Sequence, residues 1–104
     1  MSVLTHEIKE ELKGLIYEFF SEECGAEVND LKEDTNIIND LDGDSLLFVE
    51  LIELIKKKYS LNIQLQTIGK YLLKNPASTI GQVIETSYLI YEHENNIVNL
   101  GSIA

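Results

Sequence analysis

A chain of 104 residues is long enough for one folded domain and too short for two, and its hydrophobic fraction of 44% excludes a disordered protein. The net charge of −10 is concentrated in residues 1–44, which hold 13 acidic and 3 basic side chains, whereas residues 45–104 hold 5 of each. This charge repels nucleic acid and anionic lipid, so we expect no nucleic-acid partner and expect basic partners to approach the first half. The same charge could also serve solubility alone.

The expected cellular compartment follows from three features that the sequence lacks: a membrane span, a signal peptide and a pair of cysteines. No apolar run reaches the ~18 residues of a transmembrane helix, which predicts no membrane span. The first residues have neither the basic start nor the apolar stretch of a signal peptide. Cys24 is the single cysteine, so no internal disulfide can form. Together these features predict a cytoplasmic protein.

Hydrophobic periodicity predicts the first half of the fold. Apolar residues recur at steps of three and four between Thr5 and Cys24, which indicates an amphipathic helix over 5–24 that Gly25 ends. Residues 25–44 are rich in Asn and Asp, which form turns, and predict a long loop. We expect this loop to be packed onto the core by its apolar residues, Val28, Leu31, Ile37, Ile38 and Leu41.

The second half is predicted to hold three more helices. One should start at Asp44 or Ser45 and end near Tyr59, with a run of three lysines favouring its negative end. A short helix is expected over 65–73, and the last helix should open at Thr79, with Gln82 completing a capping box. Strand-like alternation is confined to residues 60–65. The sequence therefore predicts an all-α bundle of three main helices, a short extra helix and a long first loop.

The run Gly43-Asp44-Ser45-Leu46 is the candidate site, and its simplest interpretation is structural. Asp44 or Ser45 can cap the helix, because an oxygen there accepts hydrogen bonds from the free N–H groups of the first turn. If Ser45 were the N-cap residue of a capping box, position 48 would need Glu or Gln, whereas the sequence has Phe48. Capping also leaves the open Asp-Gly turn before the serine unexplained.

A calcium loop is a second interpretation, because acidic residues precede Gly43. With Gly43 at loop position six, positions one and twelve fall on Ile38 and Val49, which have no side-chain oxygen. We therefore expect no metal site.

A hydrolase is a third interpretation, because Gly-Asp-Ser-Leu is also the signature of an esterase and lipase family. A nucleophilic serine needs a histidine base, and the two histidines, His6 and His93, lie near opposite ends of the sequence. Those enzymes resemble α/β proteins, whereas this sequence predicts no sheet. We therefore expect no catalytic residues.

A covalent carrier is the fourth interpretation, in which a separate transferase modifies the serine. Such a serine needs exposure and a rigid helix start but no activation. Asp42-Gly43 provides an open turn, Asp44 provides a negative approach surface, and the positive helix end favours an attached phosphodiester.

The surrounding sequence supports this fourth interpretation. The segment from Ile37 to Leu46 resembles the phosphopantetheine attachment segment of acyl carrier proteins, with Asp40-Leu41, two small or variable residues and then Asp-Ser-Leu. Downstream, Val49-Glu50-Leu51 is similar to that family's valine-glutamate-leucine, Tyr59 stands at its phenylalanine, and Ile63 matches its next isoleucine. The resemblance covers about residues 5–94.

The resemblance implies a four-helix carrier bundle over residues 1–94 and a non-catalytic acyl carrier. Ser45, flanked by Asp44 and Leu46, would carry 4′-phosphopantetheine from coenzyme A, and its thiol, not Cys24, would hold the acyl group as a thioester. Implied partners are a phosphopantetheinyl transferase (holo-carrier synthase) and acyl-loading, elongating or transferring enzymes of fatty acid, lipid or polyketide-type synthesis. We expect a monomer.

The resemblance also implies two further groups of residues. Partner enzymes of the family contact the second helix, so the docking residues would be Asp40, Asp44, Leu46, Leu47, Phe48, Val49, Glu50 and Glu53. The acyl chain would be sheltered by residues for which ordinary core is the competing role, namely Leu51, Ile55, Ile63, Leu72 and Ile84.

The sequence departs from the fatty-acid-synthesis type in its second helix, which has Leu47 and Phe48 in its first turn and three lysines at its end. The two apolar residues either form a contact surface or fold inward. Residues 95–104 are unmatched and would pack on the bundle or fray. These departures predict a specialised carrier. A peptidyl or aminoacyl carrier and an unmodified helical interaction module remain alternatives.

Overall fold

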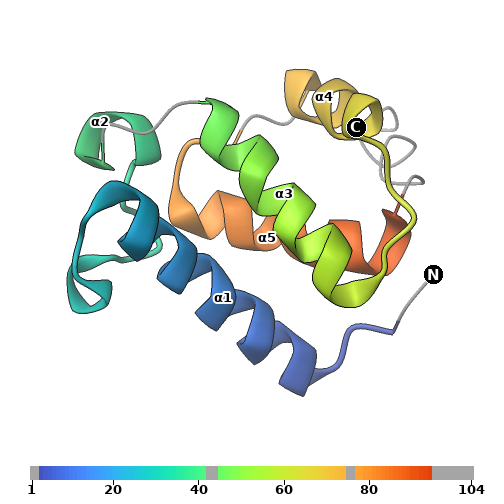
Figure 1. Ribbon diagram of the computed structural model, residues 1–104, viewed down its shortest axis with the longest axis horizontal. Coiled ribbons are helices and arrows are strands. Elements are labelled where there is room, and N and C mark those ends of the chain that lie inside the picture. The colour runs from blue at the N-terminus through green and yellow to red at the C-terminus, as the bar shows by residue number, and fades with distance from the viewer. Residues whose placement is uncertain (1–2, 42–44, 75–76, 95–104) are drawn as a thin grey trace.

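The computed structural model describes residues 3–41, 45–74 and 77–94, and these residues fold into a helical bundle (Figure 1). The helices are α1 (His6–Cys24), α2 (Ile37–Leu41), α3 (Ser45–Tyr59), α4 (Leu65–Lys74) and α5 (Ile80–His93), and a 3₁₀ turn, η1, spans Val28–Asp30. Within the described ranges there is no strand, and the β-type pairing is an isolated antiparallel bridge between Asn36 and Thr79. The predicted all-α fold is confirmed.

Local signals placed the boundaries of α1 correctly. The Thr5 hydroxyl oxygen accepts a hydrogen bond from the Ile8 N–H at 3.2 Å and caps the first turn. At the other end Gly25 adopts the left-handed conformation, with φ of 67°, and its N–H bonds to the Ser21 carbonyl. Glycine takes this conformation at little cost, so α1 stops there.

The α5 start was also predicted correctly. The Thr79 hydroxyl oxygen accepts from the Gln82 N–H at 3.2 Å, and Gln82 Oε1 accepts in return from the Thr79 N–H at 3.1 Å. This is the expected capping box. The ends of α3 and α4 lie within one residue of the predicted positions.

The segment between α1 and α3 is more ordered than the loop we expected, because it contains η1 and α2. Leu31 and Ile37 are buried and Leu41 is half-buried, as predicted. Val28 and Ile38 are wrong as core anchors, since they are 47% and 60% exposed. Ile37 and Ile38 are consecutive on a helix, so their side chains point about 100° apart and only one faces the core.

The core lies between α1, α3 and α5. In Figure 1, α3 and α5 run in the same general direction and α1 runs against both. The buried apolar side chains of α1 recur every fourth residue and meet those of α3 and α5. The set is Leu12, Ile16, Phe20, Phe48, Leu51, Ile52, Ile55, Ile80, Val83, Ile84 and Ile90. Ile68 and Tyr71 bring α4 onto this core. No helix in the described part of the chain is long and apolar enough to cross a membrane.

Candidate functional site at the start of helix α3

Ser45 is the first residue of α3. Asp42, Gly43 and Asp44, where the sequence predicts an open turn, lie outside the described residues, and so do the side chains of Ser45 and Leu46. The first N–H groups of a helix have no intrahelical partner and carry the positive end of the helix dipole. The backbone at Ser45 therefore offers the environment in which a phosphate group is favoured.

Helix α2, the last described element before Ser45, is fixed by a reciprocal cap. Asn36 Oδ1 accepts hydrogen bonds from the N–H groups of Ile38 at 3.0 Å and Asn39 at 2.9 Å. Asp40 Oδ2 accepts in return from the Asn36 N–H at 2.8 Å. Asp40, which we expected as a docking residue, is exposed. Its hydrogen bond also holds the first turn of α2 together.

The chain before α2 is attached to the start of α5 by backbone hydrogen bonds. The Ile37 N–H donates to the Ser78 carbonyl at 2.9 Å, and the Ile80 N–H donates to the Thr35 carbonyl at 3.1 Å. The Gly81 N–H donates to the Glu33 carbonyl at 2.8 Å, and a Cβ on Gly81 would lie 3.0 Å from that oxygen. These contacts place α2 at the end of the bundle where α5 begins.

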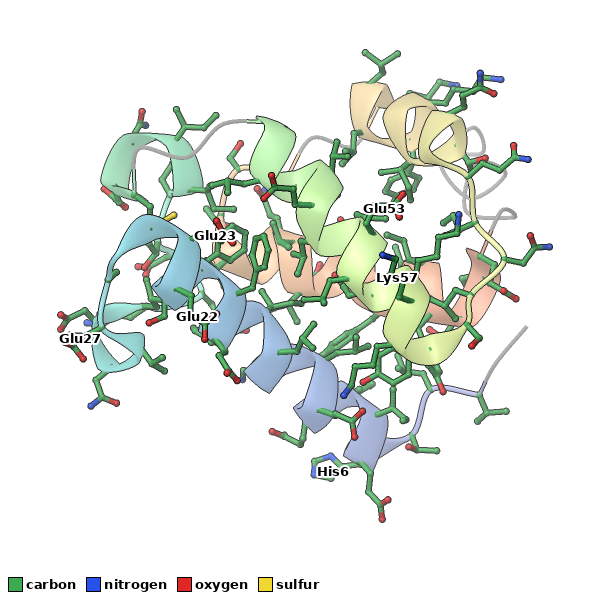
Figure 2. The ribbon with its side chains drawn as sticks, in the orientation of Figure 1. His6, Glu22, Glu23, Glu27, Glu53 and Lys57 are labelled. Atoms are coloured by element: carbon green, nitrogen blue, oxygen red, sulfur yellow. The ribbon has the colours of Figure 1, made fainter. Side chains whose placement is uncertain are left out.

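Both histidines lie at the other end of the bundle. His6 begins α1 and His93 ends α5, and Figure 2 shows His6 far from the start of α3. The last residue of α3, Tyr59, is nearby, because its hydroxyl donates to Glu11 Oε1 at 2.5 Å and its ring lies 5.2 Å from that of Tyr91. With a rise of about 1.5 Å per residue, Tyr59 is about 21 Å from Ser45 along α3. Neither imidazole can reach Ser45, which argues against the hydrolase interpretation.

The calcium interpretation depends on Asp42 and Gly43, which lie outside the described residues. Among residues 3–41, 45–74 and 77–94, no group of three or more His, Cys, Asp or Glu side chains could hold a metal ion. Cys24 is half-buried at the end of α1.

Comparison with known proteins supports the carrier interpretation. Residues 14–85 match the family described as the phosphopantetheine attachment site. The chain is also 58% identical over 101 residues to a protein of Clostridium acetobutylicum named acyl carrier protein homolog, covering 97% of this chain and 98% of that one. The chain belongs to the acyl carrier protein family. The cofactor of this family is 4′-phosphopantetheine, and the matched residues include α3 and the segment that leads to it.

The face of α3 that we expected a partner to contact is only partly exposed in this acyl carrier protein. Val49 is 38% exposed, Glu50 is exposed, and Glu53 and Leu47 are half-buried. Phe48 is 8% exposed and belongs to the core, so its placement on a docking surface is wrong. The physical reason is helical spacing, because Phe48 lies three, four and seven residues before the buried Leu51, Ile52 and Ile55.

The residues expected to line an acyl chain lie together in the bundle. Leu51, Ile55, Ile63 and Ile84 are buried, and Leu72 is half-buried against the same core. Their position is that of ordinary core residues and also that of a lining for a chain inserted between the helices.

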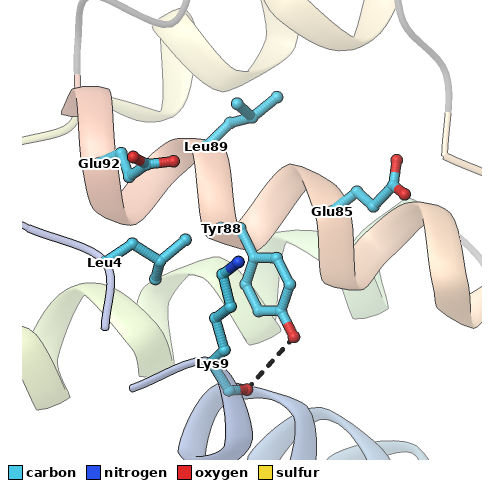
Figure 3. Close-up of a pocket in the computed structure, with 6 residues that line it drawn as sticks. All are labelled: Leu4, Lys9, Glu85, Tyr88, Leu89 and Glu92. Carbon is cyan, nitrogen blue, oxygen red and sulfur yellow. Dashed lines mark hydrogen bonds between the residues drawn. The ribbon is translucent and has the colours of Figure 1, made fainter. Parts of the chain in front are cut away.

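A second region lies on the side of the bundle where α1 begins (Figure 3). A hollow of about 300 Å³ is lined by Leu4, Lys9, Glu85, Tyr88, Leu89 and Glu92. The Tyr88 hydroxyl donates to the Lys9 carbonyl at 3.3 Å, and Lys9 Nζ lies 5.7 Å from the Tyr88 ring centre. Burial, with Glu10 and Glu33 nearby, raises the pKa of Tyr88. This hollow lies near the start of α1 and the end of α5, away from Ser45.

Sequence reasoning missed the residues that position the site. Asn36 is a favoured helix N-cap residue directly before Ile37, so a local signal for α2 was present, although Asp40 lies four residues after it and not at the three-residue spacing of a capping box. The contacts between residues 33–37 and 78–81 join segments more than 40 residues apart and have no local signal.

Proposed function

We propose that the Ser45 hydroxyl of this acyl carrier protein is the attachment point for 4′-phosphopantetheine. The observation that supports this most is the position of Ser45 as the first residue of α3, inside the matched family segment. In the reaction, the Ser45 oxygen forms a bond to the phosphorus of the phosphopantetheine part of coenzyme A, the nucleotide part leaves, and the serine gives up its proton. A transferase supplies the catalysis, which agrees with the distance of both histidines from Ser45.

The residues present fit this group. The free N–H groups at the start of α3 favour the negative phosphodiester. When bound, the group supplies a thiol that holds an acyl chain as a thioester. This chain's own residues then hold, shelter and present the cargo, with Leu51, Ile55, Ile63, Leu72 and Ile84 as the proposed lining.

The proposed partners are a phosphopantetheinyl transferase and the enzymes that load, elongate or transfer acyl groups in fatty acid, lipid or polyketide-type synthesis. The proposed docking residues are Asp40, Asp44, Leu46, Leu47, Val49, Glu50 and Glu53. We propose a cytoplasmic, non-catalytic monomer, and the cargo decides between an acyl carrier and an aminoacyl or peptidyl one.

The test is intact-mass measurement after incubation with coenzyme A and a phosphopantetheinyl transferase. We expect a gain of one phosphopantetheinyl group in the wild-type chain and in Ser78→Ala, which removes an exposed serine hydroxyl elsewhere. Ser45→Ala should gain nothing. Failure of the wild-type chain to gain mass with several transferases would contradict the proposal and favour an unmodified interaction module. Mass spectrometry of the protein isolated from cells then identifies the cargo.

A further inference from the structure

Ser87, in the middle of α5, has a side-chain oxygen that the fold leaves without a hydrogen bond. The residue is fully buried, with 0% of its surface exposed, and its Oγ has no partner among the described residues. A helical serine can satisfy its hydroxyl by donating to the carbonyl three or four residues earlier, and Ser87 makes no such bond. Burying a hydroxyl without a partner costs free energy, so such atoms are rare in folded proteins and call for an explanation.

The surroundings of Ser87 offer its hydroxyl little to bind. Ser87 lies three residues after Ile84 and three before Ile90, so it belongs to the stripe of α5 that faces the core. The buried side chains that the described parts of α1 and α3 bring to this core are all apolar. Thr86, the neighbouring buried polar residue, points about 100° away around the helix. The position therefore fits a polar group on a molecule that enters the core.

Ser87 adjoins the residues proposed to line the acyl chain. Ile84, one of those residues, lies one turn before Ser87 on α5 and belongs to the same core cluster as Ile55 of α3. Helices α3 and α5 run in the same general direction, so α5 begins toward the end of the bundle that holds Ser45 (Figure 1). Ser87 is seven residues beyond Ile80, about 10 Å along α5. A chain that enters the core from the Ser45 end would therefore pass the Ser87 hydroxyl.

We propose that Ser87 makes the core prefer an acyl chain that carries a hydroxyl or keto oxygen over an unsubstituted chain. The Ser87 hydroxyl donates to a keto oxygen or exchanges a hydrogen bond with a hydroxyl, so that both buried polar groups are satisfied. An unsubstituted chain leaves the Ser87 hydroxyl unpaired, and without Ser87 the oxygen of a substituted chain is unpaired instead. That the ligand is a cargo held on Ser45 rests on the proposed function.

The test loads Ser45 with chains of one length that differ only in an oxygen. A phosphopantetheinyl transferase attaches the octanoyl or hydroxyoctanoyl arm from the corresponding coenzyme A thioester, and intact mass confirms loading. The hydroxyl is placed near the thioester, in the middle of the chain or at its far end in turn. Calorimetry gives the Tm of each loaded form. For at least one position, Ser87→Ala should lower the Tm of the hydroxyoctanoyl form relative to the octanoyl form by at least about 4 °C, compared with the wild type.

Two controls separate hydrogen bonding from packing. Ile90→Val shortens the next buried side chain of the same stripe and keeps the Ser87 hydroxyl, so it should change the Tm of the octanoyl and hydroxyoctanoyl forms equally. In the unmodified chain Ser87→Ala should raise Tm, because it removes an unpaired buried oxygen. A fall in that Tm would show that the hydroxyl has a partner within the protein and would overturn the inference.

The loading step separates the two proposals. Mass gain at Ser45, with the same Tm difference between hydroxyoctanoyl and octanoyl forms in the wild type and in Ser87→Ala at every hydroxyl position, would contradict this inference alone. Failure to gain mass with any transferase would contradict the proposed function, and with it the cargo assigned to Ser87.

Discussion

Tyr59 connects the end of α3 to α1 at the end of the bundle opposite Ser45. Its hydroxyl donates to Glu11 Oε1 at 2.5 Å, and its ring packs edge-to-face on Tyr91. Burial raises the pKa of Tyr59 above its ordinary value near 10, and the carboxylate of Glu11 raises it further because ionised Tyr59 would lose the hydrogen bond and face a like charge. The folded protein therefore keeps this proton at a pH at which the unfolded chain releases it.

This shift predicts a loss of stability in alkali. Above pH about 10 the unfolded chain binds fewer protons than the folded one, so the Tyr59 contribution, complete below that pH, declines as the pH rises toward the folded-state pKa. Tyr59→Phe should cost about 1 kcal/mol at pH 7, where the hydrogen bond is lost. Its stability should then fall less steeply than that of the wild type above pH 10.

Urea unfolding at a series of pH values measures both effects. Tyr17→Phe, which changes a half-buried tyrosine elsewhere on α1, is the control and should keep the wild-type slope. Tyr71 and Tyr88 also have raised pKa values, so a residual slope is expected in every variant. Equal slopes for wild type and Tyr59→Phe would contradict the assignment.

At the scale of elements, two helical glycines have different surroundings. A Cβ added to Gly14 in α1 meets nothing within 4 Å, whereas a Cβ on Gly81 in α5 would lie 3.0 Å from the Glu33 carbonyl oxygen. That oxygen also accepts the hydrogen bond from the Gly81 N–H at 2.8 Å. Gly81 thus allows the segment before α2 to approach α5.

Alanine substitution should separate these roles. Gly14→Ala should stabilise the protein by about 0.5–1 kcal/mol, because alanine favours the helix and restricts the unfolded chain. The free energy of unfolding of Gly81→Ala should be at least about 1 kcal/mol lower than that of Gly14→Ala, because the Glu33 carbonyl must move and its hydrogen bond weakens. Urea unfolding measures the difference, and Gly69→Ala, with nothing within 4 Å of its added Cβ, is a second control. Equal stability of all three variants would show that residues 33–37 do not constrain α5.

At the scale of the whole molecule, charge repulsion acts against compactness. The net charge is −10, and 13 of the 18 acidic side chains lie in residues 1–44. The described contact of Glu10 with His6, at 3.9 Å, and the ion pair of Glu11 with Lys58, at 3.8 Å, are exposed and long, so each contributes little.

Salt should therefore stabilise this protein. Raising NaCl from about 0.02 M to about 0.5 M shortens the screening length from roughly 20 Å to roughly 4 Å and weakens the repulsion. We expect Tm to rise by several degrees, which corresponds to about 1 kcal/mol for a domain of this size. Calorimetry measures the rise, and Glu7→Gln/Glu27→Gln should show a smaller one. A Tm that stays constant or falls with salt would show that repulsion is not significant.

The sequence by itself determined helices α1, α3, α4 and α5, the caps of α1 and α5, and the position of Ser45 at the start of α3. Thr5, Gly25 and the Thr79–Gln82 box act through hydrogen bonds that span a few residues, so their patterns are visible along the chain. The family resemblance around Ser45 is likewise contained in one continuous segment.

Only the tertiary structure decided which apolar residues are buried. Helix α3 has apolar residues on most of its faces, so periodicity could not place Phe48 in the core and Leu54 on the surface. Packing against α1 and α5 determines which of these side chains are buried. The same holds for Ile37 and Ile38, and for the contact of residues 33–37 with the start of α5, because these depend on segments that are distant in sequence. The hollow lined by Leu15 and Phe19 of α1 and Leu54 of α3 exists for the same reason, since each helix supplies only part of its lining.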